Sequence, residues 1–169
     1  MQYGLIGERL GHSYSKKIHS LIADYDYELL ELAPEKVSDF MTGRKFKAIN
    51  VTIPYKQTVI PYLDYIDPAA EQIGAVNTVI SKGGKLYGYN TDFYGMKAQI
   101  SFMGLGLAGK KVLILGTGGT SKTSYAAAKS LGAKEIYRVS RRESENILTY
   151  SQAMGNHSDA NFIINTTPV

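Results

Sequence analysis

The chain has 169 residues, of which 44% are hydrophobic and 20% charged, an ordinary composition for a globular protein with a sizeable core. Its net charge of +4 suits an anionic substrate or cofactor, but the Lys and Arg residues are scattered, which argues against a nucleic-acid partner. There is no Cys, the three His residues (His12, His19 and His157) lack metal-ligand spacing, and no apolar run approaches membrane-spanning length. We therefore expect a cytoplasmic enzyme or binding protein with no metal site and no membrane partner.

The first part of the chain predicts an α/β domain over residues 1–104. Strands are expected at 2–6, 26–31, 46–53, 76–81 and 85–90, and helices at 15–24, 34–42, 55–64, 68–74 and 92–104. The segments VNTVIS and KLYGY, joined around Gly83–Gly84, are typical of a hairpin. The sheet of this domain therefore cannot be purely parallel.

The second part, residues 105–169, shows a different pattern. The apolar strands KVLIL, EIYRVS and NFIINT alternate with the helical segments TSKTSYAAAKSLG and ESENILTYSQAMG. This βαβαβ order predicts a parallel sheet that is buried on both faces. Three strands leave one edge and one face without cover, so we expect either a fragment or a sheet that something else completes.

The loop LGTGGTSKT after the first of these strands resembles two phosphate-binding motifs. Gly116 and Gly118 match the dinucleotide pattern G-x-G-x-x-G, with Ser121 at the third position. Gly116, Lys122 and Thr123 match the P-loop pattern, with Ser121 again replacing a glycine. A third interpretation is a glycine-rich turn that binds nothing.

The end of the next strand favours the dinucleotide. An acidic residue about 20 residues past the loop is typical of NAD binding, and an Arg there is typical of NADP binding. Here the strand ends in Ser140, Arg141 and Arg142, and no strand of this part ends in the Asp that a P-loop needs for Mg²⁺. Two arginines can bind a phosphate dianion, although they are also common as solvated residues before a helix. The pattern predicts NADP bound to the first half of a Rossmann domain.

Two stretches of the first domain carry candidate chemistry. In GHSYSKKIH, Ser13 and Ser15 precede a helix, and either could cap it or present a hydroxyl to a carboxylate. In NVTIPYKQ, Thr52 lies on a strand and Lys56 comes just past its end, where ligand sites of α/β sheets gather. A Lys in such a cleft suits proton transfer, although a surface Lys is the commoner case.

The hairpin supplies a third stretch. Asn77 opens one of its strands, and Asn90-Thr91-Asp92 closes the other. Thr91 or Asp92 could be the N-cap of the helix expected at 92–104. Alternatively, the Asp92 carboxylate could hold Lys56 and tune its pKa.

Taken in order, these motifs resemble the shikimate dehydrogenase family over the whole chain. The matching segments are HSYS near the N-terminus, NVTIPYK, GAVNT, NTDFYG, the GTGGTS loop, the basic VSRR tip and NTTPV. The family usually has Asn and Thr around the arginine of the tip, and a second Arg three residues on. This chain has Ser140, Arg142 and Glu145 at those positions. The family also continues well past NTTPV.

The resemblance implies a reaction and roles for individual residues. It implies NADPH-dependent reduction of 3-dehydroshikimate to shikimate, a step of aromatic amino-acid biosynthesis, by a monomer or homodimer. Lys56 and Asp92 would be the catalytic pair. Substrate would be bound by Ser13, Ser15, Thr52, Asn77 and Asp92, and cofactor by Gly116, Gly118, Gly119, Thr120, Ser140, Arg141 and Arg142. The alternatives are a quinate/shikimate dehydrogenase with broader substrate or NAD use, a non-catalytic substrate-binding fragment and, more distantly, a P-loop nucleotidase.

Overall fold

The computed structural model describes residues 1–11 and 13–167, so His12 and the last two residues of the NTTPV motif lie outside the described residues. The chain forms two compact units, Met1–Thr91 and Asp92–Val169. The sequence divides the domains after residue 104 instead, and those limits stay a prediction of domain organisation. Both units are of the α/β class that the sequence predicts.

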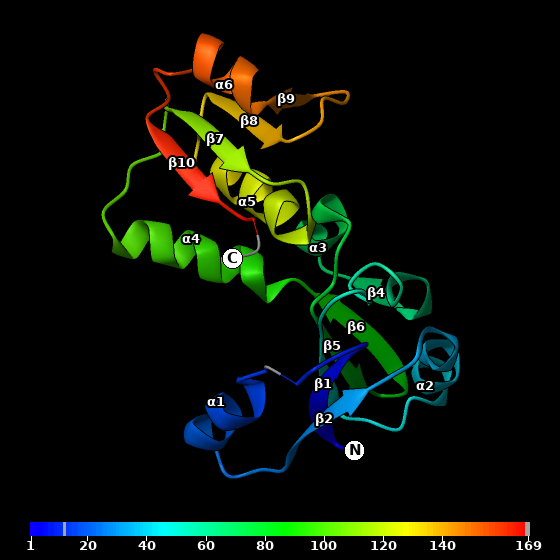
Figure 1. Cartoon of the computed structure of the whole chain (residues 1–169). Coiled ribbons are helices and arrows are strands. Elements are labelled where there is room, and N and C mark those ends of the chain that lie inside the picture. Colours follow the sequence, from blue (N-terminus) through cyan, green and yellow to red (C-terminus); the bar gives the residue numbers. More distant parts are fainter. Residues whose placement is uncertain (12, 168–169) are drawn as a thin grey trace. The chain divides into compact units, whose positions relative to one another are not determined.

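The first unit contains a mixed six-stranded sheet of order β2-β1-β3-β5-β6-β4 (Figure 1). Its strands are β1 (Tyr3–Gly7), β2 (Tyr27–Glu31), β3 (Ala48–Val51), β4 (Tyr65–Ile66), β5 (Thr78–Lys82) and β6 (Lys85–Tyr89). β1 pairs in parallel with β2 and β3, whereas β5 runs antiparallel to both β3 and β6. The predicted hairpin around Gly83–Gly84 is confirmed, and it makes the sheet mixed.

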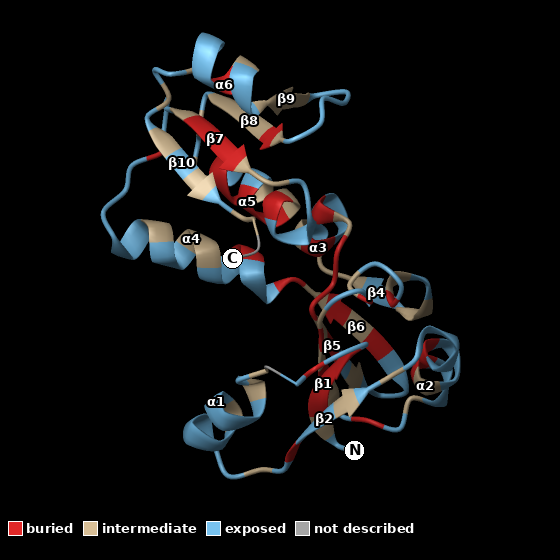
Figure 2. Ribbon diagram, viewed as in Figure 1, coloured by how far each residue is buried: buried red, intermediate tan, exposed pale blue. Residues whose placement is uncertain are grey.

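The helices of the first unit differ in how far they are buried. They are α1 (Ser15–Ile22), η1 (Pro34–Lys36), α2 (Val37–Gly43), η2 (Ile60–Tyr62) and α3 (Pro68–Ile73). Buried residues of α2 and α3 join those of β1, β3, β5 and β6 in the main core. Helix α1 contributes no buried residue, and Figure 2 shows it in the colours of exposed and half-buried residues.

The helix predicted at 55–64 is wrong. The chain after Thr52 makes successive turns, then the short helix η2, and then the two-residue strand β4. Pro61 has no N–H to donate to the carbonyl four residues earlier, so an α-helix through this segment would lose a hydrogen bond. Tyr55 and Val59 are buried in the core instead, which keeps the segment packed without regular helix.

The second unit is a parallel four-stranded sheet of order β10-β7-β8-β9. Its elements are α4 (Thr91–Phe102), β7 (Lys111–Leu115), α5 (Gly119–Ser130), β8 (Glu135–Ser140), β9 (Ile147–Thr149), α6 (Tyr150–Asn156) and β10 (Phe162–Asn165). One face of the sheet packs against Ile100 of α4 and Ala128 of α5, and the other packs against Ala153 of α6. The sheet is therefore covered on both faces, as the apolar strands predict. The expectation that one face lacks cover is wrong, because α4 and α5 pack on one face and α6 packs on the other.

The helix predicted at 143–155 is wrong in its first half. Residues 147–149 form β9, which adds a fourth strand to the predicted three, and the helix begins only at Tyr150. Asn146 has a positive φ of 59°, which interrupts a right-handed helix. Thr149 then starts α6 with a capping box, in which its hydroxyl and the Gln152 side chain each satisfy a backbone N–H.

Candidate functional site

The carboxyl end of β3 holds Thr52 and Lys56 beside the start of β5. The Thr52 N–H donates to the Ile6 carbonyl at 2.9 Å, which continues the strand pairing past β3. A cis peptide precedes Pro54. The Val76 N–H donates to the Lys56 carbonyl at 2.8 Å, so the backbone of the half-buried Lys56 lies next to the segment that carries Asn77. The structure thus brings NVTIPYK and GAVNT together, as sites at strand ends require.

Hydrogen bonds of the Asn77 side chain link this end of the sheet to Thr91, two residues after β6. Its side chain is only 6% exposed, and its Oδ1 accepts hydrogen bonds from the Thr91 N–H at 2.9 Å and the Thr91 hydroxyl at 3.1 Å. Asn90 is buried and donates from Nδ2 to the Ala75 carbonyl at 3.0 Å. Because an N–H can only donate, Oδ1 of Asn77 must face Thr91, and its Nδ2 group is turned the other way.

Asp92 follows Thr91 directly and lies in the first turn of α4. A carboxylate in that turn is favoured by the free N–H groups and the dipole of the helix. Asp92 is exposed and begins the second of the two compact units. Its pairing with Lys56 stays a prediction.

Ser13 and Ser15 lie at the start of α1, and each is already engaged. The Ser13 hydroxyl accepts a hydrogen bond from the Ser15 N–H at 3.2 Å, a capping-type contact, although the N-cap position itself is Tyr14. Ser15 hydrogen-bonds the phenol of Tyr27, which lies at the start of β2. Both interpretations of these serines remain open, because a hydroxyl that makes one such bond can still bind a carboxylate.

Sequence reasoning missed Tyr27 and gave Asn50 no role. Burial raises the pKa of Tyr27 to about 12, with Tyr25 adding to the rise and the Ser15 hydrogen bond opposing it. Tyr27 therefore stays protonated, and it donates to Asn50 Oδ1 at 2.6 Å. His19 stacks on its ring at a centroid distance of 3.8 Å. The available sequence signal was Asn50 itself, which alternates with Thr52 along one face of the strand.

A cavity of about 390 Å³ lies against this face of the first unit. Tyr27, His19, Asn50 and Thr78 line it together with Tyr3, Tyr25, Ala48, Ile49 and Ile80. Its wall includes Asn50 but none of Ser13, Ser15, Thr52, Lys56 and Asn77. We therefore take the hydrogen-bonded strand ends, and not this cavity, as the candidate substrate site.

In the second unit, the loop after β7 contains glycines of two kinds. Gly116 has a φ of +109°, and a Cβ there would lie 2.7 Å from the Thr166 hydroxyl, so both its conformation and its surroundings require glycine. Gly118 and Gly119 have no positive φ, and a Cβ at either would meet nothing within 4 Å. Folding therefore does not explain these two glycines, whereas close approach of a ligand to the backbone would.

The helix after this loop begins at the open glycines. Gly118 is the N-cap of α5, and no side chain caps the helix, so its first N–H groups are available to an anion. Ser121, at the position of the third motif glycine, is fully buried and donates to the Gly116 carbonyl at 2.6 Å. Thr120 is exposed in the first turn of the helix.

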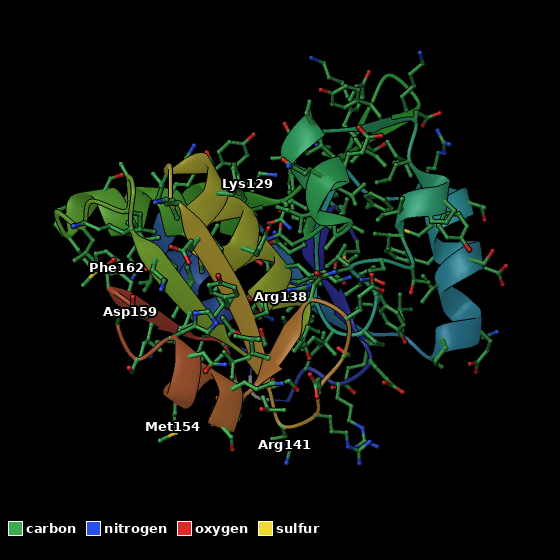
Figure 3. The ribbon with its side chains drawn as sticks, turned by 90° about the horizontal axis from the view of Figure 1, so that it is seen from above. Lys129, Arg138, Arg141, Met154, Asp159 and Phe162 are labelled. Atoms are coloured by element: carbon green, nitrogen blue, oxygen red, sulfur yellow. The ribbon has the colours of Figure 1, made fainter. Side chains whose placement is uncertain are left out.

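The ends of the strands bear on the choice of phosphate motif. The described strands of this sheet end in Leu115, Ser140, Thr149 and Asn165, so none of them ends in the Asp of a P-loop enzyme. Ser140 is half-buried at the end of β8, and Arg141 follows it in an exposed loop (Figure 3). This arrangement matches the dinucleotide pattern and not the P-loop.

The negative charge of Glu143, close to the basic tip along the chain, is held by a hydrogen bond. Glu143 accepts a hydrogen bond from Gln152 Nε2 at 2.8 Å, so its carboxylate is directed to α6. Arg141 and Arg142 are both exposed.

Within residues 1–11 and 13–167, no group of three or more His, Asp and Glu side chains is placed to hold a metal ion, and no helix is long and apolar enough to cross a bilayer.

Comparisons with known proteins point to one enzyme family. The family described as "Shikimate dehydrogenase substrate binding domain" matches residues 5–79. Over 99% of this chain, the shikimate dehydrogenase (NADP(+)) of Clostridium beijerinckii is 38% identical, and the match covers 67% of that protein. The enzyme of the same name from Halothermothrix orenii is 43% identical over 82% of this chain and 51% of its own length.

A solved structure extends the similarity to three dimensions. Shikimate 5-dehydrogenase from Thermus thermophilus, in complex with NADP(H) and shikimate, matches 99% of this chain with a TM-score of 0.85 and 26% identity. The chain spans about half to two thirds of the length of these relatives, including 68% of the Thermus chain. An alignment that covers 99% of the chain at 38% identity, and 67% of the Clostridium beijerinckii enzyme, shows that the chain belongs to the shikimate dehydrogenase family.

Proposed function

We propose that this protein interconverts 3-dehydroshikimate and shikimate with NADP as cofactor. The observation that carries the proposal is the 38% identity, over 99% of the chain, to an enzyme named for that reaction. The gathering of Thr52, Lys56 and Asn77 at one end of one sheet supports it. The monomeric or homodimeric state and the cytoplasmic location stay predictions of the sequence.

In the proposed reaction, the first unit binds the substrate and handles the proton. Ser13 and Ser15 bind the substrate carboxylate, and Thr52 and Asn77 bind ring hydroxyls. The Lys56 ammonium donates a proton to the carbonyl oxygen as that oxygen gains negative charge, and the neutral amine removes the proton in the reverse direction. Asp92, which comes directly after the first unit along the chain, orients Lys56 and accepts a hydrogen bond from a substrate hydroxyl.

The second unit has a cradle that fits a dinucleotide. The open backbone at Gly118 and Gly119 and the uncapped start of α5 suit a pyrophosphate, together with Gly116 and Thr120. Ser140, Arg141 and Arg142 would hold the 2′-phosphate that distinguishes NADP from NAD. When bound, NADPH supplies the hydride.

The test is oxidation of shikimate by this 169-residue chain, followed as NADPH absorbance, together with calorimetric binding of shikimate. Lys56→Met should lower turnover by about 10²–10⁴-fold and change shikimate affinity far less, because the ammonium acts on the developing charge. The matched control is Lys45→Met, which removes an exposed ammonium outside the site.

Two results would change the conclusion. Turnover of Lys56→Met near that of the unaltered chain would contradict the proton-transfer role. Shikimate binding without any turnover would favour a second candidate, a substrate-binding piece whose catalysis needs more chain. That candidate is supported by the partial coverage of the relatives.

A further inference from the structure

Thr78 is the last residue of the GAVNT segment, and neither the sequence analysis nor the proposed roles assign it a function. Thr78 is the first residue of β5 and lies directly opposite Asn50 of β3 in the antiparallel register. Directly opposed residues of antiparallel strands place their side chains on the same face of the sheet. Consistent with this register, Asn50 Nδ2 donates to the Thr78 hydroxyl at 3.2 Å.

The same hydroxyl also reaches the neighbouring Asn77. Thr78 Oγ1 donates to Asn77 Oδ1 at 3.1 Å, and it lies 3.5 Å from the Thr91 hydroxyl. A hydroxyl has one hydrogen to donate and lone pairs to accept with, so Thr78 can serve both amides at once. It accepts from one Asn and donates to the other.

These contacts make a hydrogen-bond chain with a single direction. Ser15 contacts Tyr27, and Tyr27 donates to Asn50 Oδ1. Asn50 then donates to Thr78, and Thr78 donates to Asn77. Because Oδ1 of each Asn accepts, each amide has one orientation in which every contact is satisfied.

We propose that Thr78 is a positioning residue that holds the side-chain amides of Asn50 and Asn77 in one orientation, with Asn77 Nδ2 directed to the substrate. The proposal rests on the proposed function, since it concerns the substrate-binding role of Asn77. The Thr91 N–H and the Thr78 hydroxyl both donate to Oδ1 of Asn77, and Thr78 also links this amide to Asn50 on the neighbouring strand.

The test compares Thr78→Val with Thr78→Ser in the full 169-residue chain. Val has nearly the same shape as Thr and suits a strand, so it removes the hydroxyl and little else. Ser keeps the hydroxyl. Ser81→Ala is the control, because Ser81 lies on the same strand outside the candidate site. We expect Thr78→Val to weaken calorimetric shikimate binding about tenfold, and Thr78→Ser and Ser81→Ala by less than about threefold.

Where turnover is measurable, the loss in Thr78→Val should fall on KM with kcat nearly unchanged, because a contact to a ring hydroxyl is equally strong before and during hydride transfer. Equal shikimate affinity in Thr78→Val and the unaltered chain would overturn the proposal. Shikimate binding by Thr78→Ser as weak as that by Thr78→Val would also overturn the proposal. The loss of affinity would then follow the shape of the side chain and not its hydroxyl.

A second measurement does not depend on ligand. In NMR spectra of the free protein, the side-chain NH₂ signals of Asn50 and Asn77 should both move in Thr78→Val and stay in place in Ser81→Ala. Unmoved signals in Thr78→Val would overturn the proposal even if shikimate binds. Absence of shikimate binding by the unaltered chain, with both signals moved, would instead count against the proposed function alone.

Discussion

Gly116 and Gly118 are two residues apart in one loop, yet the structure predicts different effects when each is replaced by Ala. The replacement at Gly116 should lower stability, and the replacement at Gly118 should weaken cofactor binding. At Gly116, φ is +109° and a Cβ would lie 2.7 Å from the Thr166 hydroxyl, and 3.3–3.4 Å from the Thr166 backbone carbonyl. At Gly118, φ is −72° and a Cβ would meet nothing within 4 Å. The first glycine is required by the fold, and the second is free to serve a ligand.

The magnitudes follow from these two environments. A non-glycine residue held at positive φ costs about 1–3 kcal/mol, and forcing a methyl against packed backbone costs about 1–3 kcal/mol more. Gly116→Ala should therefore lower the free energy of unfolding by about 2–6 kcal/mol. Gly118→Ala should change it by about 1 kcal/mol or less, since the poorer N-cap is partly offset by a less flexible unfolded chain.

The assay is urea unfolding of both variants followed by circular dichroism, with NADP⁺ and NAD⁺ binding by calorimetry. Gly118→Ala should remain folded and weaken NADP⁺ binding by about tenfold or more, or about 1.4 kcal/mol, because the added methyl occupies the backbone side of the cradle. The reasoning is refuted if Gly118→Ala unfolds as easily as Gly116→Ala. It is equally refuted if Gly118→Ala binds NADP⁺ as tightly as the unaltered chain.

Two further predictions concern charge. Arg141→Ala should weaken NADP⁺ binding by about 10–100-fold, the loss of a charge-assisted phosphate contact, and NAD⁺ binding by much less; equal losses in calorimetry would rule out a 2′-phosphate contact. Lys111 donates to Asp159 at 2.8 Å, and this hydrogen bond holds the pKa of Asp159 below its usual range, so its stabilisation is present above the unfolded pKa and disappears as the pH falls through the folded value. Asp159→Asn should thus lower the melting temperature at about pH 7 and match the unaltered chain near pH 2, and a pH-independent difference would contradict the assignment.

Local sequence patterns were sufficient for much of the fold. KVLIL, EIYRVS and NFIINT form parallel strands because continuous apolar runs suit a sheet covered on both faces. The hairpin at Gly83–Gly84 was predictable because glycines tolerate the positive φ values of 59° and 75° found there. The family was predictable because short motifs recur in a set order along the chain.

The two wrong helix predictions, at 55–64 and in the first half of 143–155, rested on the spacing of apolar residues alone. Residues 55–64 look helical by apolar spacing, but Pro61 removes a hydrogen bond and Tyr55 packs into the core. Residues 147–149 look like the start of a helix, but they pair with β8 as β9 after Asn146 turns the chain at positive φ. In each segment a single residue, Pro61 or Asn146, disfavours the helix locally, and packing or strand pairing then stabilises the observed conformation.

The sequence by itself determined the family, the order of strands and helices along most of the chain and the residues expected to carry the chemistry, because these depend on residue type and short-range spacing. Only the tertiary structure decided which glycine the fold requires and which polar side chains meet. Tyr27 reaches Asn50 across β1, and Asn50 faces Thr78 across the β3–β5 register. Such contacts depend on how distant strands pair, and no spacing along the chain encodes that register directly.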